Sequence, residues 1–548
     1  MSTIDFTDPS LSHPSLGTFI AHDADGAYQF LGVQYATLEH RLAESQLRTS
    51  YKSPVDARNH GPASYSPTDG FENEMTFIQQ ALPKPKIKHS DVDCLNLNIT
   101  VPKLASGIGG LSKQKLPVFI WTHGGGFVVG ANSWPQYDHA KLVKLAAKNG
   151  VPIIGVGINF RLGLSGLLTS KELRDRGYKS NNTLRDQRNA FRWVKRYISG
   201  FGGDPDNITV IGESTGAVAT TLHLYSPEKL FNRAIATGGS FLLVGPFSPE
   251  IYEGVYQRVL SVLGLDALGP DKRVKQLLSL PLDEIIAKLP PDIPFMPVID
   301  GDIVPIRPSY AAIASREDLT LPGKKWLDGF MIGDSQFDAS TLGAIMGHLK
   351  NDSRKRFSAS LRTSLGSIPE AAESVLETYG FTSPALGSQA EDDEAAFRNY
   401  LHFVNDVGYY AATVSFARGW PEPKLFTFAF NEPNPWEGLY MGEATHVLDV
   451  VFLFQNYNDK LPSGQQKAAE SFGLDLARFI AGQEPWIAYS QSRRNAKVFG
   501  PSKSEAFSQM ISDNESEESG RRVKILDIGK AAGFDALAEA IVRFQLGL

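Results

Sequence analysis

The sequence predicts an α/β fold with a large, mixed, mostly parallel central sheet, helices on both of its faces and helical cap insertions. From residue 94 onward, short apolar runs alternate with amphipathic helical patterns, an order typical of parallel strands joined by helices. Hydrophobic residues make up 42% and charged residues 21% of the chain, as in ordinary globular proteins. Helical patterns poor in strands occupy about 246–289 and 354–420, and no flexible linker sets them apart. We therefore predict one domain over residues 1–548.

The elements follow in order from local pattern. Residues 17–36 carry apolar runs on both sides of Asp25-Gly26 and predict an antiparallel hairpin. Helices are expected at 138–148 and at 184–198, where Ala190, Phe191 and Val194 share one face. The expected strands are short apolar or alternating runs, at 95–101, 116–121, 152–160, 208–211, 329–333 and 424–430.

Residues 66–92 have no clean period and contain three prolines. Phe71, Met75, Phe77 and Ile78 are spaced as in a short amphipathic piece. The segment is either a surface excursion, which we favour, or a mobile lid.

Charge and cysteine content narrow the class of protein. The formal net charge of −6 comes without a basic patch, so nucleic acid is not an expected partner. The single cysteine, Cys94, excludes an internal disulfide and favours a reducing compartment, so we expect a cytoplasmic protein. The N-terminus has no signal-peptide pattern, and no apolar run is long enough for a membrane span. The acidic run at 513–518 is expected to be a solvated loop.

The strongest motif is Gly212-Glu213-Ser214-Thr215-Gly216, which follows a β-branched run and precedes an Ala-rich helical segment. This strand, sharp turn and helix are the context that a G-x-S-x-G nucleophile elbow requires. Its glycines leave room for a turn that exposes the serine at the tip. Ser214 is therefore the predicted nucleophile.

A serine nucleophile needs a histidine base and a carboxylate that orients it. In chains with this elbow the order is Ser, acid, His, which leaves four histidines: His223, His348, His402 and His446. His446 follows a predicted strand in a loop, whereas the other three lie in helical stretches, so His446 is the predicted base.

The acid should follow a strand between Ser214 and His446. Asp334 and Asp338 both do, directly after the run at 329–333, and nothing local chooses between them. The backbone donors for an oxyanion are predicted upstream, in His123-Gly124-Gly125-Gly126-Phe127, where three glycines follow a core strand.

These motifs resemble the type B carboxylesterase family, which includes cholinesterases and fungal lipases and has the α/β-hydrolase fold. The landmarks occur in the family's order at 30–36, 93–98, 123–127, 159–163, 184–187, 201–205, 212–216 and 295–301. In character the chain is nearest to fungal carboxylesterases.

The resemblance implies the remaining roles. The family's acid lies five residues after a glycine, which corresponds to Asp338 after Gly333, although Glu is commoner there. The implied oxyanion donors are the N–H groups of Gly125, Gly126 and Thr215, where most relatives have Ala in place of Thr215. Glu213 corresponds to the family's buried acid that supports the histidine.

The sequence therefore predicts a serine hydrolase that cleaves carboxylic esters through an acyl-enzyme, with a small-molecule ester as partner and no cofactor or metal. The alternative is an acyltransferase, transesterase or lactone-forming enzyme of a biosynthetic pathway, and a non-catalytic binding protein is a third reading. Relatives close the excursion before Cys94 with a disulfide, which this chain cannot form. No Trp lies between Tyr65 and Cys94, so choline esters are not expected substrates.

Overall fold

The computed structural model describes residues 9–384, 387–503, 506–512 and 520–547, so the acidic run at 513–518 lies outside the described residues. The strands are β1 Ser10–His13, β2 Gly17–Ala24, β3 Ala27–Gln34, β4 Ala36–Thr37, β5 Gln46–Leu47, β6 Val55–Ala57, β7 Asn96–Pro102, β8 Leu116–Thr122, β9 Ile154–Ile158, β10 Gly203–Glu213, β11 Arg233–Thr237, β12 Gly329–Ser335, β13 Leu425–Phe430, β14 Asn495–Lys503 and β15 Ala506–Ser512.

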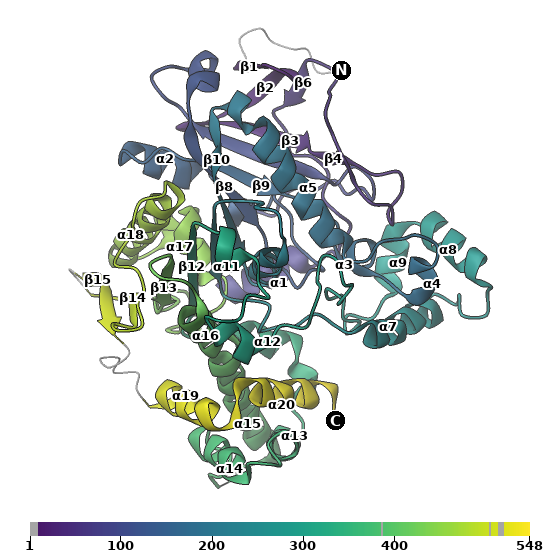
Figure 1. Ribbon diagram of the computed structural model, residues 1–548, viewed down its shortest axis with the longest axis vertical. Coiled ribbons are helices and arrows are strands. Elements are labelled where there is room, and N and C mark those ends of the chain that lie inside the picture. Colours follow the sequence, from purple (N-terminus) through teal and green to yellow (C-terminus); the bar gives the residue numbers. More distant parts are fainter. Residues whose placement is uncertain (1–8, 385–386, 504–505, 513–519, 548) are drawn as a thin grey trace.

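The helices surround the strands on both sides (Figure 1). They are α1 Gly70–Ile78, α2 Ala140–Lys148, α3 Gly163–Leu167, α4 Lys171–Arg174, α5 Asn182–Tyr197, α6 Thr215–Leu222, α7 Pro249–Val262, α8 Pro270–Ser279, α9 Leu282–Lys288, α10 Tyr310–Ala314, α11 Gly323–Trp326, α12 Ser340–Ile345, α13 Ser353–Ser364, α14 Pro369–Thr378, α15 Gln389–Val404, α16 Ala411–Gly419, α17 Leu448–Phe454, α18 Ser463–Ile480, α19 Arg521–Ala532 and α20 Phe534–Leu546.

The central sheet has the order β1-β2-β3-β7-β9-β8-β10-β11-β12-β13-β14-β15, with β6 paired to β2, over the described part of the chain. From β9 to β14 every neighbouring pair is parallel. β7 is antiparallel to both of its neighbours, and β2 and β3 form the predicted hairpin. The large mixed, mostly parallel sheet is thus confirmed.

Successive side chains along a strand alternate between the two faces of the sheet and so contribute to two apolar cores. On β8, Val118 and Ile120 point into one core while Phe119 and Trp121 point into the other, because successive side chains leave opposite faces of a strand. Helices α5 and α6 pack into the first core, and α2, α17 and α18 pack into the second. Helices therefore cover both faces, as predicted.

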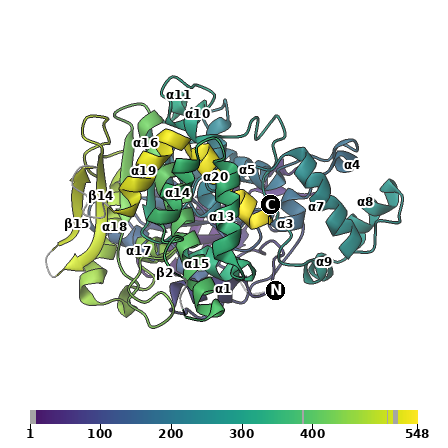
Figure 2. The same cartoon turned by 90° about the horizontal axis from the view of Figure 1, so that it is seen from below.

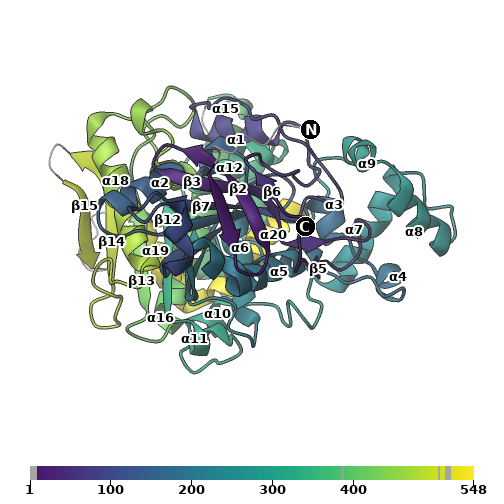
Figure 3. The same ribbon diagram turned by 90° about the horizontal axis from the view of Figure 1, so that it is seen from above.

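Two groups of helices stand away from the sheet. α7, α8 and α9 lie within 246–289 and form a lobe with α4 (Figure 3). α13, α14 and α15 lie within 353–404, and the C-terminal helices α19 and α20 pack against this group (Figure 2), whereas α16 packs against β12 and β13. The sequence patterns did not predict β11, β14, β15 or these C-terminal helices. In the described part of the chain, every helix is too short or too polar to cross a membrane.

The excursion at 66–92 contains α1, which packs into the second core through Phe71, Met75 and Ile78. Glu74 on this helix is buried and accepts hydrogen bonds from Tyr137 Oη at 2.6 Å and Gln136 Nε2 at 2.8 Å. Beyond the helix, Gln79 Nε2 donates to the Trp436 carbonyl at 3.1 Å. Packing and hydrogen bonds anchor this segment in place of a disulfide, and Cys94 is buried and free.

Two of the sequence landmarks meet in a fully buried ion pair. Arg161 follows β9 and donates from Nε to Asp186 Oδ2 at 2.7 Å and from Nη2 to Oδ1 at 2.8 Å. Its Nη1 also donates to the carbonyls of Arg41 and Ala43, so every arm of the guanidinium is used. Such a bidentate, fully hydrogen-bonded pair fixes the orientation of α5 against the sheet.

Candidate active site

The candidate residues come together at the carboxyl ends of neighbouring parallel strands. The glycine run follows β8, Ser214 follows β10, Asp338 follows β12, and His446 lies in the loop that leaves β13. These strands belong to one parallel series, so their carboxyl ends meet at the same edge of the sheet. Residues that are far apart in sequence, such as Asp338 and His446 at 108 positions, therefore face one another only because of the sheet order.

Ser214 lies at a strained turn, with φ of 55° and ψ of −127°. A Cβ atom on Gly212 would lie 2.2 Å from the Gly216 carbonyl oxygen, and one on Gly216 would lie 2.0 Å from the Thr122 carbonyl oxygen. Both glycines are therefore sterically required. The Ser214 N–H donates to the Thr237 carbonyl at 3.1 Å, which ties the elbow to β11.

His446 and Asp338 form a buried pair. The His446 Nδ1 atom is 2.9 Å from Asp338 Oδ1, and the Ser335 N–H donates to Asp338 Oδ2 at 2.6 Å. The carboxylate accepts from Nδ1–H, which leaves Nε2 as the basic nitrogen. Within the described residues Nε2 makes no well-aligned hydrogen bond, although Glu213 Oε1 lies 3.1 Å from it.

The other candidate carboxylate, Asp334, lies against an arginine of a C-terminal helix. Its Oδ2 atom is 3.0 Å from Arg522 Nη2 on α19. Of the two carboxylates that the local pattern left open, the structure brings Asp338, the one that the family resemblance implied, to the imidazole and Asp334 to a C-terminal arginine.

Glu213 faces the opposite side of the imidazole, with Oε1 3.1 Å from His446 Nε2. Burial lowers the pKa of His446, but the charges of Glu213 and Asp338 and the Asp338 hydrogen bond outweigh it and raise this pKa to about 9. Burial also raises the pKa of Glu213 well above its ordinary value, so the two groups compete for one proton.

The glycine run forms an open backbone turn beside Ser214. Gly125 has φ of +94° and Gly126 has φ of +64°, a region that favours glycine. The N–H groups of Gly125, Gly126 and Thr215 have no acceptor among the described residues. Thr215 adds one contact, because its Oγ1 accepts from the Phe127 N–H at 3.2 Å.

The remaining candidate histidines are not in the cluster. His223 is buried with Nε2 2.8 Å from Gln187 Oε1, and His348 is exposed. His402 packs its ring 4.7 Å from that of Phe337.

Sequence reasoning missed three groups near the imidazole. Asp449 is buried and its Oδ2 accepts from Thr237 Oγ1; burial first, then the charge of Asp338, raise its pKa to about 6. Tyr409 places its ring 6.1 Å from that of His446. Asn405 contacts the loop that carries Asp338. A lone carboxylate inside the apolar run 447–454 was the one local signal, and it pointed to Asp449.

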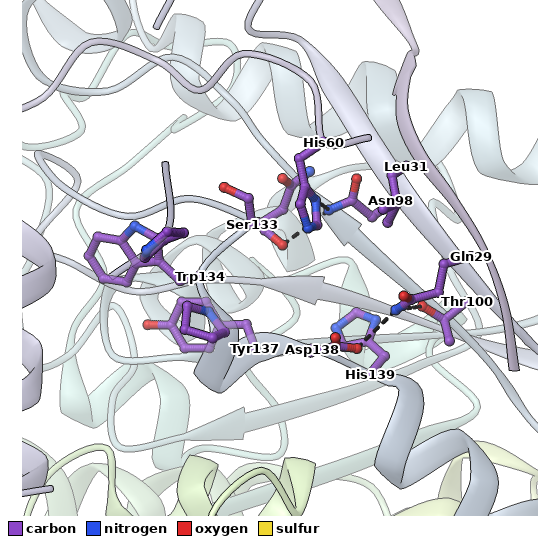
Figure 4. Close-up of a pocket in the computed structure, with 13 residues that line it drawn as sticks. Gln29, Leu31, His60, Asn98, Thr100, Ser133, Trp134, Tyr137, Asp138 and His139 are labelled. Atoms are coloured by element: carbon purple, nitrogen blue, oxygen red, sulfur yellow. Dashed lines mark hydrogen bonds between the residues drawn. The ribbon is translucent and has the colours of Figure 1, made fainter. Parts of the chain in front are cut away.

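A separate hollow of about 240 Å³ lies beside Tyr137 (Figure 4). Gln29 crosses one end of it, with Nε2 2.9 Å from Asp138 Oδ1. Its lining includes none of the candidate catalytic residues; it consists of Gln29, Leu31, His60, Pro85, Asn98, Thr100, Asn132, Ser133, Trp134, Pro135, Tyr137, Asp138 and His139.

Comparison with known proteins agrees with this geometry. The chain is 27% identical over 490 residues to Lipase 3 of Yarrowia lipolytica, covering 87% of this chain and 89% of the lipase. It is 31% identical over 555 residues to a cholinesterase of Mus musculus, covering 91% of this chain and 83% of that enzyme. A solved carboxylesterase of Geobacillus stearothermophilus shares the fold, with a TM-score of 0.70 at 23% identity, over 94% of this chain and 99% of that one.

The sequence model described as "Carboxylesterase family" matches residues 16–508, which include the elbow, the glycine run and both residues of the buried Asp–His pair. The chain therefore belongs to the carboxylesterase family of carboxylic ester hydrolases.

Proposed function

We propose that this protein cleaves carboxylic esters through an acyl-enzyme formed on Ser214, with His446 as base and Asp338 as its orienting acid. The observation that carries the proposal is the buried contact of 2.9 Å between His446 Nδ1 and Asp338 Oδ1, which leaves Nε2 basic beside the serine turn.

In the first half of the reaction, Ser214 Oγ attacks the ester carbonyl carbon and gives its proton to His446 Nε2. The tetrahedral intermediate then collapses, the bond to the alkoxy oxygen breaks, and His446 returns the proton to the leaving alcohol. Water repeats these steps on the acyl-enzyme and releases the acid. Asp338 stays ionised and holds the Nδ1–H tautomer throughout.

The intermediate carries its negative charge on the former carbonyl oxygen. The N–H groups of Gly125, Gly126 and Thr215 are the proposed donors to it, since they have no acceptor in the described part of the protein. Each such donor is worth roughly 3 to 4 kcal/mol of barrier.

Covalent trapping tests the proposal. An alkyl fluorophosphonate should inactivate the enzyme with one adduct per chain, and peptide mapping should place that adduct on Ser214. A folded sample that hydrolyses aryl acetates without such an adduct would contradict the acyl-enzyme route.

The raised pKa of His446 predicts an alkaline pH dependence. Only the neutral imidazole accepts the serine proton, so kcat/KM should fall as pH drops through the pKa of about 9. Glu213→Gln removes a negative charge that favours the imidazolium, so the acid limb should move to lower pH by about one unit or more. A pH series of kcat/KM for both proteins checks this, and an upward move in the variant would reject the role of Glu213.

The Thr215 hydroxyl gives a second prediction. Thr215→Val keeps the side-chain shape but leaves the buried Phe127 N–H without its acceptor. We expect kcat to fall about five- to tenfold, since an unsatisfied buried donor costs about 1 kcal/mol or more. Thr215→Ser keeps the hydroxyl and should stay within about twofold of wild type. Equal losses in both variants would show that the side-chain shape matters, not the hydrogen bond.

Substrate range and location extend the proposal. The stretch before Cys94 lacks a Trp on which a quaternary ammonium could rest, so aryl and alkyl esters are the proposed substrates instead of choline esters. Faster hydrolysis of butyrylthiocholine than of a neutral butyrate thioester would refute this. We also propose a cytoplasmic location, supported by the single, buried and unpaired Cys94, and cell fractionation tests it.

A further inference from the structure

The loop that carries Asp338 is held from two sides. On one side it pairs with the His446 loop, because the Phe337 N–H donates to the Ala444 carbonyl at 2.8 Å and the His446 N–H donates to Ser340 Oγ at 3.3 Å. These hydrogen bonds hold the loop that carries Asp338 beside the loop that carries His446. The Gln336 N–H also donates to the Phe430 carbonyl at 3.0 Å, which ties the start of this loop to β13.

On the other side the loop meets the amide side chain of Asn405, and Arg522 Nη2 also reaches the carbonyls of Ser335 and Gln336 at 3.4 Å each. The Asn405 Oδ1 accepts from the Ala339 N–H at 3.1 Å, and its Nδ2 donates to the Gln336 carbonyl at 3.0 Å. The two bonds therefore bracket Asp338 by one residue on its C-terminal side and two on its N-terminal side. Asn405 and Asp338 are both fully buried, so no water competes for these backbone groups.

Asn405 lies at an unusual place in its helix. It begins a π-helical segment, Asn405–Tyr410, between α15 and α16. The wider turn presents Asn405 to the acid loop and Tyr409 to the His446 ring on the same segment. Single π-turns of this kind are frequent at functional sites because they re-aim side chains within a helix.

The next residue anchors this segment to the C-terminal helix. Asp406 is fully buried, pairs with Arg521 Nε, accepts from Tyr379 Oη at 2.9 Å, and has Oδ1 3.6 Å from Arg522 Nε. Arg522 in turn reaches Asp334 on the strand that leads into the acid loop. The ion pairs and the hydrogen bond of Asp406 thus hold the helical segment that carries Asn405 against its neighbours.

We propose that Asn405 is a positioning residue for the proposed catalytic acid, holding Asp338 at the distance at which it orients His446. Its amide can satisfy both flanks at once because it carries one acceptor and one donor, whereas a carboxylate or a hydroxyl cannot reproduce that pattern. The inference rests on the proposed triad, because Asn405 touches neither substrate nor the reacting atoms and acts only through Asp338.

A double-mutant cycle tests the inference on the full-length protein with an activated aryl acetate. The four proteins are wild type, Asn405→Ala, Asp338→Asn and the double variant. We expect Asn405→Ala to lower kcat about 10- to 100-fold with KM within about threefold, as for a small misplacement of a catalytic group. In the Asp338→Asn background the same change should lower kcat less than about threefold, since the contact it supports is already lost.

The pH profile gives a readout that simple destabilisation would not move. A looser Asp338 raises the pKa of His446 less, so the acid limb of kcat/KM for Asn405→Ala should shift to lower pH. Asn405→Leu is the second variant if the alanine protein does not fold. It fills a similar volume but offers neither an acceptor to the Ala339 N–H nor a donor to the Gln336 carbonyl, and the expected shift is in the same direction.

Asn232→Ala is a control, because that amide also bridges two segments, one through a backbone N–H and the other through a side-chain carboxylate, but at the amino ends of the strands. Its Oδ1 accepts from the Ile208 N–H at 3.1 Å and its Nδ2 is 3.1 Å from Asp328 Oδ2. It should lower the melting temperature without a shift in the pH profile.

Equal kcat losses from Asn405→Ala in both backgrounds, or an unmoved pH profile, would overturn the positioning role and leave the triad intact. If Asp338→Asn itself retains wild-type kcat, the proposed triad fails instead, so the two failures are distinguishable.

Discussion

Ser214→Ala is expected to lower kcat for aryl acetate hydrolysis at least about 10⁵-fold, because the protein then has no group at the tip of the elbow that attacks the carbonyl. The alanine methyl group fits the existing turn, because serine has a Cβ atom at the same place and the backbone there already adopts φ of 55°. The folded protein should therefore remain, with an unchanged melting temperature and circular dichroism spectrum. A residual rate above that of water is expected from the backbone donors alone.

Ser226→Ala is the control for this variant. Ser226 lies just beyond the far end of the same helical segment, where its Oγ accepts from the Glu228 N–H at 3.2 Å. It should keep the wild-type kcat. If Ser214→Ala also kept it, ester cleavage would proceed without the elbow serine and the proposed mechanism would be rejected.

Asp338→Asn is expected to lower kcat about 10⁴-fold with little change in structure, as for loss of the orienting carboxylate in related triads. The geometry explains the size of this effect. The Ser335 N–H lies 2.6 Å from Asp338 Oδ2 and will hold the amide oxygen of the asparagine there. The NH₂ group then faces His446 Nδ1, which must accept from it, so the imidazole proton moves to Nε2 and the base is lost.

Asp334→Asn tests the choice between the two carboxylates that the local sequence pattern left open. Asp334 is joined to Arg522 and not to the imidazole, so its variant should keep the histidine tautomer and lose far less activity than Asp338→Asn. Steady-state kinetics of both variants at one pH above 9 checks the order. A larger loss for Asp334→Asn would reverse the assignment of the acid.

Much of the fold followed from pattern because the signals are local. The short apolar runs at 116–121 and 329–333 correspond to β8 and β12, and the hairpin around Asp25-Gly26 forms as β2 and β3. β11 was missed because Arg233–Thr237 has a single large apolar residue, Ile235, between two alanines, which is a weak strand pattern. The local pattern also could not predict that β7 is antiparallel to its neighbours, because the relative direction of a strand depends on which strands it pairs with.

The excursion at 66–92 shows the same limit. Its spacing indicated an amphipathic piece, and α1 is that piece, but nothing in the spacing says which surface it covers. The buried contact of Glu74 with Tyr137 joins residues 63 positions apart. Without the fold, a charged residue in such a helix reads as solvent-facing.

By itself the sequence determined the nucleophile elbow, the glycine turn and the chain order of serine, acid and base. Those features depend on backbone sterics within a few residues, such as the 2.0 Å approach that excludes a side chain at Gly216. The family resemblance implied Asp338 as the acid, but only the tertiary structure showed its contact with His446, the other polar groups around that imidazole and the bonds of Asn405 to the acid loop. These contacts join residues 108 and 66 positions apart, and such pairings depend on strand order and helix packing, not on any local preference.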